Sequence, residues 1–309
     1  MSSSQAIEGE ESEGKARPVA PAMAKGRPNQ RRFDRLIRLV SEPGFDRIEA
    51  AHVVVFGLGG VGGYAAESLA RSGVGRLTLV DFDRVCATNV NRQIQALTHT
   101  VGGSKALILA ERLQAINGRA DVRPVEAFYN AESADRLLPL DDPPTWVVDA
   151  IDNVAAKMHL MARCRAAGIP LVSSMGAAGK LDPTAVRLAD LYQTHTDPLA
   201  RVLRKRLRRE YGWPGANARG DNPSGVQVVF STESRRKPLP PSWDSVKGFQ
   251  CICPHGDNEL HSCSRRNLIE GSAGFVTATF GLVAASLVIR ELAGSDAAPT
   301  LIESGVGGP

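Results

Sequence analysis

The sequence predicts an α/β fold, a doubly wound, Rossmann-like, mostly parallel sheet with a C-terminal cap lobe. Three observations support this fold class. Short apolar runs of strand length alternate with segments of helical period, a glycine-rich turn follows the first run, and an aspartate closes the second. Strands that are separated by one helix each run parallel, with right-handed crossovers, which builds an open sheet covered by helices on both faces.

The strand runs of the first half follow each other regularly. They are "HVVVFG" (52–57), "RLTLVDFD" (76–83), "DVRPVEAF" from 121, "TWVVDAID" from 145 and "IPLVSS" from 169. Between them, "VGGYAAESLARSG" has apolar residues at helical spacing up to a glycine stop, and "GGSKALILAER" starts another helix. Residues 33–185 are therefore expected to form one Rossmann-like domain with an N-terminal arm.

The regular alternation ends after residue 185. A short strand (185–190), a basic helix (198–211), a polar loop, a second strand (226–233) and a long irregular stretch follow. The apolar run 271–289 contains many small residues, which favours a buried or interface helix over a membrane span. Residues 186–292 are therefore predicted to form a cap lobe that is closed by this helix.

Composition limits the class of protein. The chain has 309 residues, of which 43% are apolar and 23% charged, and a formal net charge of +4. This balance is ordinary for a globular protein, and it permits contact with nucleic acid without requiring it. Residues 1–32 are expected to be a disordered tail and residues 293–309 a flexible one. An odd number of cysteines, without an apolar signal segment in 1–32, leads us to expect a cytoplasmic protein.

The turn after the first strand is rich in glycine and typical of a nucleotide-binding loop. Gly57 ends the strand, and Gly59, Gly60 and Gly62 lead into a helix, whose N-terminus can hold an anion. Asp81 closes the next strand, where this kind of fold binds a ribose hydroxyl. The glycines alone do not distinguish a nicotinamide dinucleotide from another phosphorylated ligand.

The polar residues that follow favour a triphosphate. Asn89, Arg92 and Gln93 fall in a strand-end loop, and Lys105 stands near the start of the next helix. The two cations, Arg92 and Lys105, can neutralise the negative charge that builds up during transfer at phosphorus. Hydride transfer to a dinucleotide does not need them.

Two aspartates at the end of the run from 145 are candidate magnesium ligands. Asp152 is the stronger one, at the tip of a strand that faces the ligand crevice, and Asp149 is the weaker. Each charged residue also has a plain structural interpretation: Arg92 as a solvated loop cation, Lys105 as a helix-surface charge, and Asp152 as the N-cap of the next helix. Their joint occurrence at strand ends favours a nucleotide site.

These motifs resemble the ubiquitin-activating-enzyme-like superfamily of ATP-dependent adenylating enzymes, most densely over residues 45–175. The resemblance rests on Gly57-x-Gly-Gly-x-Gly, Asp81-x-Asp, Asn89-x-x-Arg92-Gln93, Lys105 and Asp152-Asn153. It implies ATP and Mg²⁺ as cofactors, a ribose contact by Asp81, and phosphate contacts by Asn89, Arg92 and Lys105. It implies catalytic roles for Arg92, Lys105 and Asp152, with magnesium held by Asp152. Members of the superfamily convert a carboxylate into an acyl adenylate and release pyrophosphate.

The second half is similar to the tRNA threonylcarbamoyladenosine dehydratases of this superfamily, over roughly residues 32–292. The similar segments are "RFDRLIRLV", "DAIDN", "GAAGKLDPTAVRLADLYQTHTDPLARVLRKRLRREYG", "VVFSTE" and "GSAGFVTATFGL". In that family ATP activates the threonyl carboxylate of a modified tRNA adenosine, and a carbamoyl nitrogen then closes a five-membered ring with loss of water. A tethered nucleophile makes a protein thiol unnecessary, which agrees with a sequence that lacks paired C-x-x-C motifs.

The resemblance also bears on partners and ions. The basic helix is predicted to bind tRNA phosphates through Arg201, Arg204, Lys205, Arg206, Arg208 and Arg209, with a solvated helix face as the alternative. A homodimer is implied, in which Arg35 or Arg38 of the N-terminal arm reaches the partner's ATP. A monovalent cation near the "GAAG" turn (176–179) is a further candidate cofactor.

Three other functions stay open. An adenylating activator of a ubiquitin-like sulfur carrier would use a sulfur-transfer partner and an accessible thiol. Cys251, Cys253 and Cys263 are the thiols in the predicted cap, and together with His255 and His261 they are also a candidate metal site. The remaining functions are a nonenzymatic nucleotide-binding scaffold and a nicotinamide dehydrogenase.

Overall fold

The computed structural model describes residues 31–215, 223–239 and 270–294. The predicted tails lie almost entirely outside these ranges. The candidate metal site formed by Cys251, Cys253, Cys263, His255 and His261 lies outside them completely.

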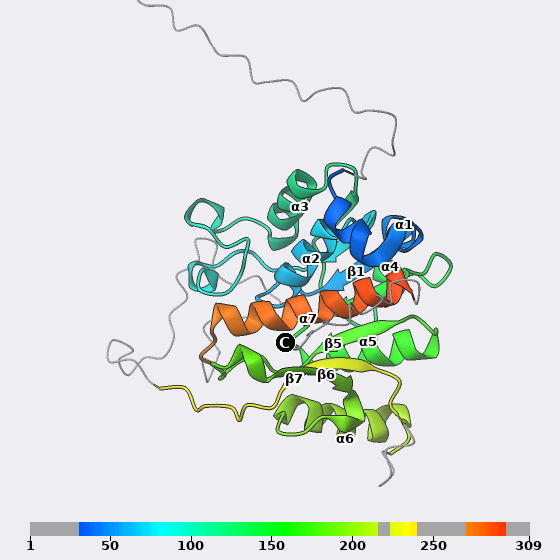
Figure 1. Ribbon diagram of the computed structural model, residues 1–309. Helices are drawn as coiled ribbons and strands as arrows, with labels where there is room; N and C mark the ends of the chain where they lie inside the picture. The colour runs from blue at the N-terminus through cyan, green and yellow to red at the C-terminus, as the bar shows by residue number, and fades with distance from the viewer. Residues whose placement is uncertain (1–30, 216–222, 240–269, 295–309) are drawn as a thin grey trace, which may run out of the picture.

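A seven-stranded sheet runs through the molecule in the order β3-β2-β1-β4-β5-β7-β6 (Figure 1). Its strands are β1 (His52–Phe56), β2 (Arg76–Val80), β3 (Asp121–Val125), β4 (Trp146–Asp149), β5 (Leu171–Ser174), β6 (Val186–Asp190) and β7 (Gln227–Ser231). All neighbours pair in parallel except β6, which is antiparallel to β7. The predicted mostly parallel sheet is confirmed. The strand order reverses between β1 and β4, where folds of this kind bind their ligands.

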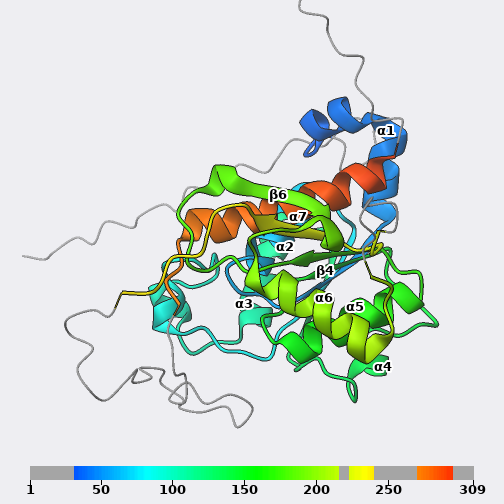
Figure 2. The same cartoon turned by 90° about the horizontal axis from the view of Figure 1, so that it is seen from below.

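Helices cover both faces of the sheet (Figures 1 and 2). They are α1 (Asp34–Ala50), α2 (Gly62–Arg71), α3 (Lys105–Ile116), α4 (Ala134–Leu137), α5 (Val154–Ala166), α6 (Pro198–Tyr211) and α7 (Gly274–Ala293). Side chains of a strand alternate between faces, so Val53 and Val55 of β1 pack with α1, α2, α3 and α7. Val54 and Phe56 pack on the other face with α4, α5 and α6. The sheet is therefore fixed by a hydrophobic core on each of its two faces.

The described part of 186–292 does not form a separate cap lobe, which corrects the sequence prediction. β7 pairs with β5, and β6 pairs with β7, so both strands extend the central sheet. Val228 and Val229 are completely buried, one in each of the two cores. A strand that is apolar on both faces is stable only inside a covered sheet, and this is why β7 joins β5.

Helix α7 has the length and composition of a membrane-crossing segment, but it packs inside the protein. Val276, Phe280, Ala285 and Val288 are buried against α1, α2 and the sheet. Small residues on α7 allow close packing, since a side chain at Gly281 would lie 2.3 Å from the carbonyl oxygen of Val61. The prediction of a buried helix is confirmed.

The basic helix α6 begins and ends where the sequence predicts. The Asp197 carboxylate caps its N-terminus by accepting a hydrogen bond from the Ala200 backbone N–H (2.9 Å), and Gly212 ends it in the left-handed conformation (φ 65°). Leu203 and Leu207 are buried against the core that contains α5. The cations therefore lie on the remaining faces of the helix.

Candidate active site

The glycine turn between β1 and α2 has a shape that requires glycine. Gly57 has a φ of +84°, and a Cβ atom there would lie 2.6 Å from the carbonyl oxygen of Ala150. A Cβ atom at Gly62 would lie 1.8 Å from the carbonyl oxygen of Gly57. No side chain caps the N-terminus of α2 in the described chain. The Gly63 backbone N–H donates to the carbonyl oxygen of Gly59 (3.1 Å), so an anion would be held by the other N–H groups of this turn.

Asp81 joins the glycine turn to the end of β2. Its buried carboxylate accepts hydrogen bonds from the backbone N–H groups of Leu58 (2.6 Å) and Asp83 (2.8 Å). Burial raises the pKa of Asp81, and the nearby Lys105 ammonium opposes that rise. Each carboxylate oxygen can accept more than one hydrogen bond, so the predicted ribose contact is compatible with this geometry.

Lys105, the first residue of α3, is the centre of a charged cluster. Its side chain is buried, and the ammonium donates a hydrogen bond to the Asp83 carboxylate (2.7 Å). Burial lowers the pKa of Lys105, but Asp81, Asp83 and Asp152 together outweigh that effect and raise it above its ordinary value. Lys105 is therefore a fixed positive charge at the carboxyl edge of the sheet. Asp83 is a site residue that was not predicted, and its signal in the sequence is the second aspartate of the Asp-x-Asp motif.

The loop after β2 lies against the glycine turn. A Cβ atom at Gly60 would lie 3.1 Å from the carbonyl oxygen of Arg92, and one at Gly59 would lie 3.8 Å from the side-chain amide of Gln93. The Arg92 guanidinium donates to the carbonyl oxygen of Thr88 (2.9 Å). The structure thus places the backbone of Arg92 and the side chain of Gln93 next to the glycines, and their contacts with the nucleotide stay a prediction.

Two amide side chains hold this loop in shape. The side-chain oxygen of Asn89 accepts a hydrogen bond from the Cys86 backbone N–H (3.0 Å), and Asn89 is buried. Gln95, which the sequence analysis did not single out, donates from its side-chain amide to the carbonyl oxygen of Leu58. Asn89 thus shapes the turn, and its contact with phosphate stays a prediction.

Asp152 is exposed at the same edge of the sheet. The N-cap of α5 is Asn153, whose side-chain oxygen accepts a hydrogen bond from the Ala156 backbone N–H (3.1 Å). The alternative interpretation of Asp152 as the helix cap is therefore wrong. Its carboxylate is one of the charges that raise the pKa of Lys105, and an exposed carboxylate oxygen suits Mg²⁺.

Asp149 is not a magnesium ligand, which corrects the second candidate from the sequence. It is completely buried and accepts hydrogen bonds from Lys157 Nζ (2.7 Å), Ser173 Oγ (2.6 Å) and the Ile151 backbone N–H (3.0 Å). Lys157 also donates to Ser173 Oγ (3.1 Å). These bonds tie β4, β5 and α5 together beneath the loop that carries Asp152.

Arg35 and Arg38 are not brought to this site within one chain. Both are exposed on α1, and Arg38 pairs with Asp34 (2.9 Å). Arg32, just before α1, donates to the carbonyl oxygen of Ile116 at the far end of α3 from Lys105. A helix of that length spans about 18 Å, which separates the arm from Lys105. The role of these arginines at a partner's ATP stays a prediction.

A basic groove of about 720 Å³ lies along α6. It is lined by Tyr192, Arg201, Arg204, Lys205, Arg208, Arg209, Gly212, Trp213 and Gly215, and none of these described residues is acidic. Burial, together with the charge of Arg201, lowers the pKa of Arg204. Such a crowded set of like charges favours binding of an anion.

The six predicted cations of α6 are not equivalent. Arg204 donates to the carbonyl oxygen of Thr194 (3.0 Å), which gives it a structural contact. Arg206 and Arg209 both pair with Glu210, and Arg206 does not line the groove. Arg201, Lys205 and Arg208 are the other cations of the groove.

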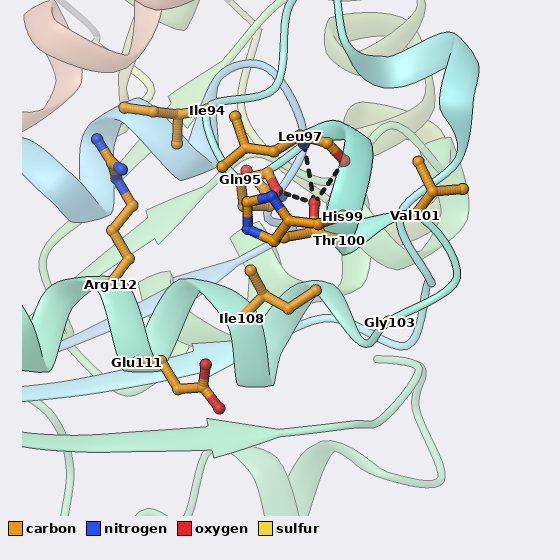
Figure 3. A pocket seen from close by; sticks show the side chains of 10 residues that line it. All are labelled: Ile94, Gln95, Leu97, His99, Thr100, Val101, Gly103, Ile108, Glu111 and Arg112. Carbon is orange, nitrogen blue, oxygen red and sulfur yellow. Dashed lines mark hydrogen bonds between the residues drawn. The ribbon is translucent and has the colours of Figure 1, made fainter. Parts of the chain in front are cut away.

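A separate hollow of about 450 Å³ lies between the 94–103 loop and α3 (Figure 3). The Thr100 hydroxyl donates to the carbonyl oxygen of Gln95 (2.7 Å) and accepts from the Leu97 backbone N–H (2.8 Å). Arg112, on the α3 side, pairs with Glu67. None of the residues predicted to bind the nucleotide lines this hollow, so the two are different places in the described chain.

Comparison with known proteins adds to this geometry. The ThiF family model matches residues 33–304. The tRNA threonylcarbamoyladenosine dehydratase of Escherichia coli K12 is 40% identical over 263 residues, which cover 85% of this chain and 94% of the relative. The enzyme of the same name from Bacillus subtilis 168 is 45% identical over 202 residues, covering 65% and 75%. A crystal structure of the E. coli enzyme in complex with ATP has a TM-score of 0.73 at 37% identity and covers 87% of this chain and 97% of that one.

Proposed function

The chain belongs to the ThiF family, and we propose that it dehydrates threonylcarbamoyladenosine in tRNA at the expense of ATP. Relatives of that name match over most of their own length. This favours the dehydratase over an activator of a sulfur carrier.

The proposed reaction has two steps. A carboxylate oxygen of the threonyl group attacks the α-phosphorus of ATP, and the bond to pyrophosphate breaks. A carbamoyl nitrogen then attacks the acyl carbon and loses its proton, and AMP leaves with the former carboxylate oxygen. Because nucleophile and acyl group belong to one molecule, the second step needs orientation rather than a protein nucleophile.

The observation that carries the proposal is the cluster around Lys105. A buried ammonium, kept charged by three aspartates, lies at the edge where the strand order reverses. Lys105 and Arg92 stabilise negative charge on the phosphates and on the leaving pyrophosphate. The glycine turn and the start of α2 hold phosphate oxygens, and Asp81 holds the ribose. Asp152 would hold Mg²⁺, which would supply further neutralisation of phosphate charge.

The proposal assigns the tRNA backbone to the groove on α6. Five cations line the groove, which suits the phosphates of a polyanion. Contacts to phosphate position an RNA, while the modified base is selected at the reacting centre. The active assembly is a homodimer in which Arg35 or Arg38 reaches the ATP of the partner subunit.

The test is to incubate the protein with ATP, Mg²⁺ and tRNA that carries threonylcarbamoyladenosine, and then to weigh the nucleosides by mass spectrometry. We expect a nucleoside lighter by one water, formed only when ATP is present. A reaction with tRNA that lacks the modification is the control. An unchanged nucleoside, with pyrophosphate exchange that depends on the C-terminus of a small carrier protein, would establish the sulfur-carrier activator instead.

A further inference from the structure

The turn after β5 contains a buried lysine near the place where the sequence suggests a monovalent cation as a candidate cofactor. Lys180 is 3% exposed, and its ammonium folds back over the turn to donate to the carbonyl oxygen of Gly176. The same ammonium lies 3.9 Å from the carboxylate of Asp197. The positive charge is therefore supplied by the chain itself.

Asp197 is the counter-charge of this lysine, and it links two elements. One carboxylate oxygen accepts from the Ala200 backbone N–H and caps α6, and the other accepts from the Gly176 backbone N–H (3.1 Å). Asp197 is 2% exposed, so its negative charge needs a partner in the protein interior. Lys180 thus neutralises the carboxylate that joins the β5 turn to the basic helix.

The turn is also held from its other side. The Gly179 backbone N–H donates to the carbonyl oxygen of Gly271 (2.7 Å), and its carbonyl oxygen accepts from the Arg236 backbone N–H (2.8 Å). Glu233 accepts from the backbone N–H of Leu181 (2.9 Å). The charge of Lys180 therefore lies at a junction of segments before α7, after β5 and after β7.

Two oxygen atoms of the turn face the Lys180 ammonium. A carbonyl oxygen and a carboxylate are typical ligands of potassium, and here both face the Lys180 ammonium. Burial outweighs the opposing charges of Asp197 and Glu233, so the pKa of Lys180 lies below its ordinary value. A monovalent ion bound by these two oxygen atoms would have to displace the Lys180 ammonium.

We propose that the Lys180 ammonium is the resident cation of the β5 turn, and that this chain binds no monovalent ion there. Lys180 is a positioning residue. It holds the turn at the nucleotide edge against the N-terminus of α6, where the tRNA contacts begin.

Chemical rescue tests this proposal. Thermal unfolding is measured for the wild type, Lys180→Ala and Lys180→Met, in KCl or NH₄Cl and in choline chloride of equal ionic strength. We expect the midpoint of the wild type to be the same in all salts. In choline, we expect Lys180→Ala to unfold about 5 °C lower, and potassium or ammonium to restore most of this loss by entering the vacated site. Lys180→Met should lose as much and gain nothing, because its stem fills the space without a charge.

Lys237→Ala is the matched control, since it removes an exposed lysine of a segment packed on the same turn. It should unfold like the wild type in every salt. Three results would overturn the proposal: a wild type stabilised by potassium over choline, a Lys180→Ala protein as stable as the wild type in choline, or a Lys180→Ala loss that no small cation restores. Unfolding needs neither ATP nor tRNA, so a failure here is distinct from a failure of the proposed reaction.

Discussion

Lys105 and Lys157 are both buried lysines that pair with an aspartate at 2.7 Å, yet their surroundings differ. The aspartate of Lys105, Asp83, has 36% of its side chain exposed, and the exposed Asp152 also acts on Lys105. The pair between Lys157 and Asp149 is completely buried, and Ser173 occupies the same carboxylate. Both lysines are paired, so it is the exposure of the partner carboxylate that separates a charge facing a ligand from a charge that holds the fold.

The largest effect on stability is expected for the completely buried pair of Lys157 and Asp149. Lys157→Met leaves the Asp149 charge buried without its partner, which should lower the free energy of unfolding by about 3–5 kcal/mol. Urea denaturation measures it. The double variant Asp149→Leu/Lys157→Met should recover most of the loss, because it removes both charges. A Lys157→Met protein as stable as the wild type would show that this pair does not hold the fold.

A change in the partly exposed pair of Lys105 and Asp83 should lower the catalytic rate more than the stability. Lys105→Met removes the charge that stabilises phosphate, so we expect the rate of cyclisation to fall about 100–1000-fold. Its loss of stability should be smaller than that of Lys157→Met, since Asp83 can be solvated. Initial rates from nucleoside mass spectrometry, corrected for the folded fraction, check this. Equal rates for Lys105→Met and Lys157→Met at equal folded protein would end the distinction between the two lysines.

Asp152 tests whether the exposed side of the cluster binds metal. Asp152→Asn removes a charged oxygen ligand, and we expect the Mg²⁺ concentration for half-maximal rate to rise about tenfold or more. Rates over a magnesium titration measure it. Asp142→Asn is the control, because that carboxylate is also exposed but pairs with Arg76 at the other end of the strands. A similar shift in both variants would indicate a general effect of charge.

The cations of α6 extend the comparison to the surface. Arg201→Gln, Lys205→Gln and Arg208→Gln should each lower the slope of log affinity for tRNA against log salt by about 0.7–0.9. Arg206→Gln, on the same helix but paired with Glu210 outside the groove, should leave the slope unchanged. Filter binding over a salt series measures both. If all four variants kept the slope of the wild type, the tRNA phosphates would bind outside this groove.

The smallest effect concerns His52, an imidazole at the opposite edge of the sheet. It bonds to the Thr78 hydroxyl (2.9 Å), and burial, with the nearby Arg76, lowers its pKa to about 4. The neutral ring is thus favoured in the folded state. The contribution of His52 to the free energy of unfolding should be fully present above pH 6.5, the ordinary pKa of the side chain. As the pH falls toward 4, the free energy of unfolding should drop by about 1–2 kcal/mol. His52→Gln should remove this slope in denaturation curves taken across that range, and an unchanged slope would assign it to other groups.

Much of the fold could be predicted because its signals are local. The alternation of apolar residues and the glycine stops predicted β1, α2 and α6 closely. The partner of β7 could not be predicted in the same way. β7 pairs with β5 because both faces of β7 must be buried. The pattern of residues 226–233 does not indicate which strand is the neighbour.

The candidate site was predicted in part for the same reason. Asp81, Lys105 and Asp152 follow strands or start a helix, and parallel strands bring such positions to one edge. The environment of Asp149 cannot be predicted from the sequence, because an aspartate at a strand end is equally consistent with a metal ligand and with a buried ion pair. Gln95 carried no recognisable signal, since its partner is a backbone carbonyl distant in the chain.

The local pattern of residues is sufficient to place the strands, the helices, the glycine turn and the charged residues at strand ends. Which of those charges face a ligand and which are paired inside depends on how the segments pack. Asp149 accepts a hydrogen bond from Ser173, and Lys180 pairs with Asp197, although the two partners of each pair are distant in the sequence. The energy of a charge depends on the medium around it. That medium exists only once the segments have packed.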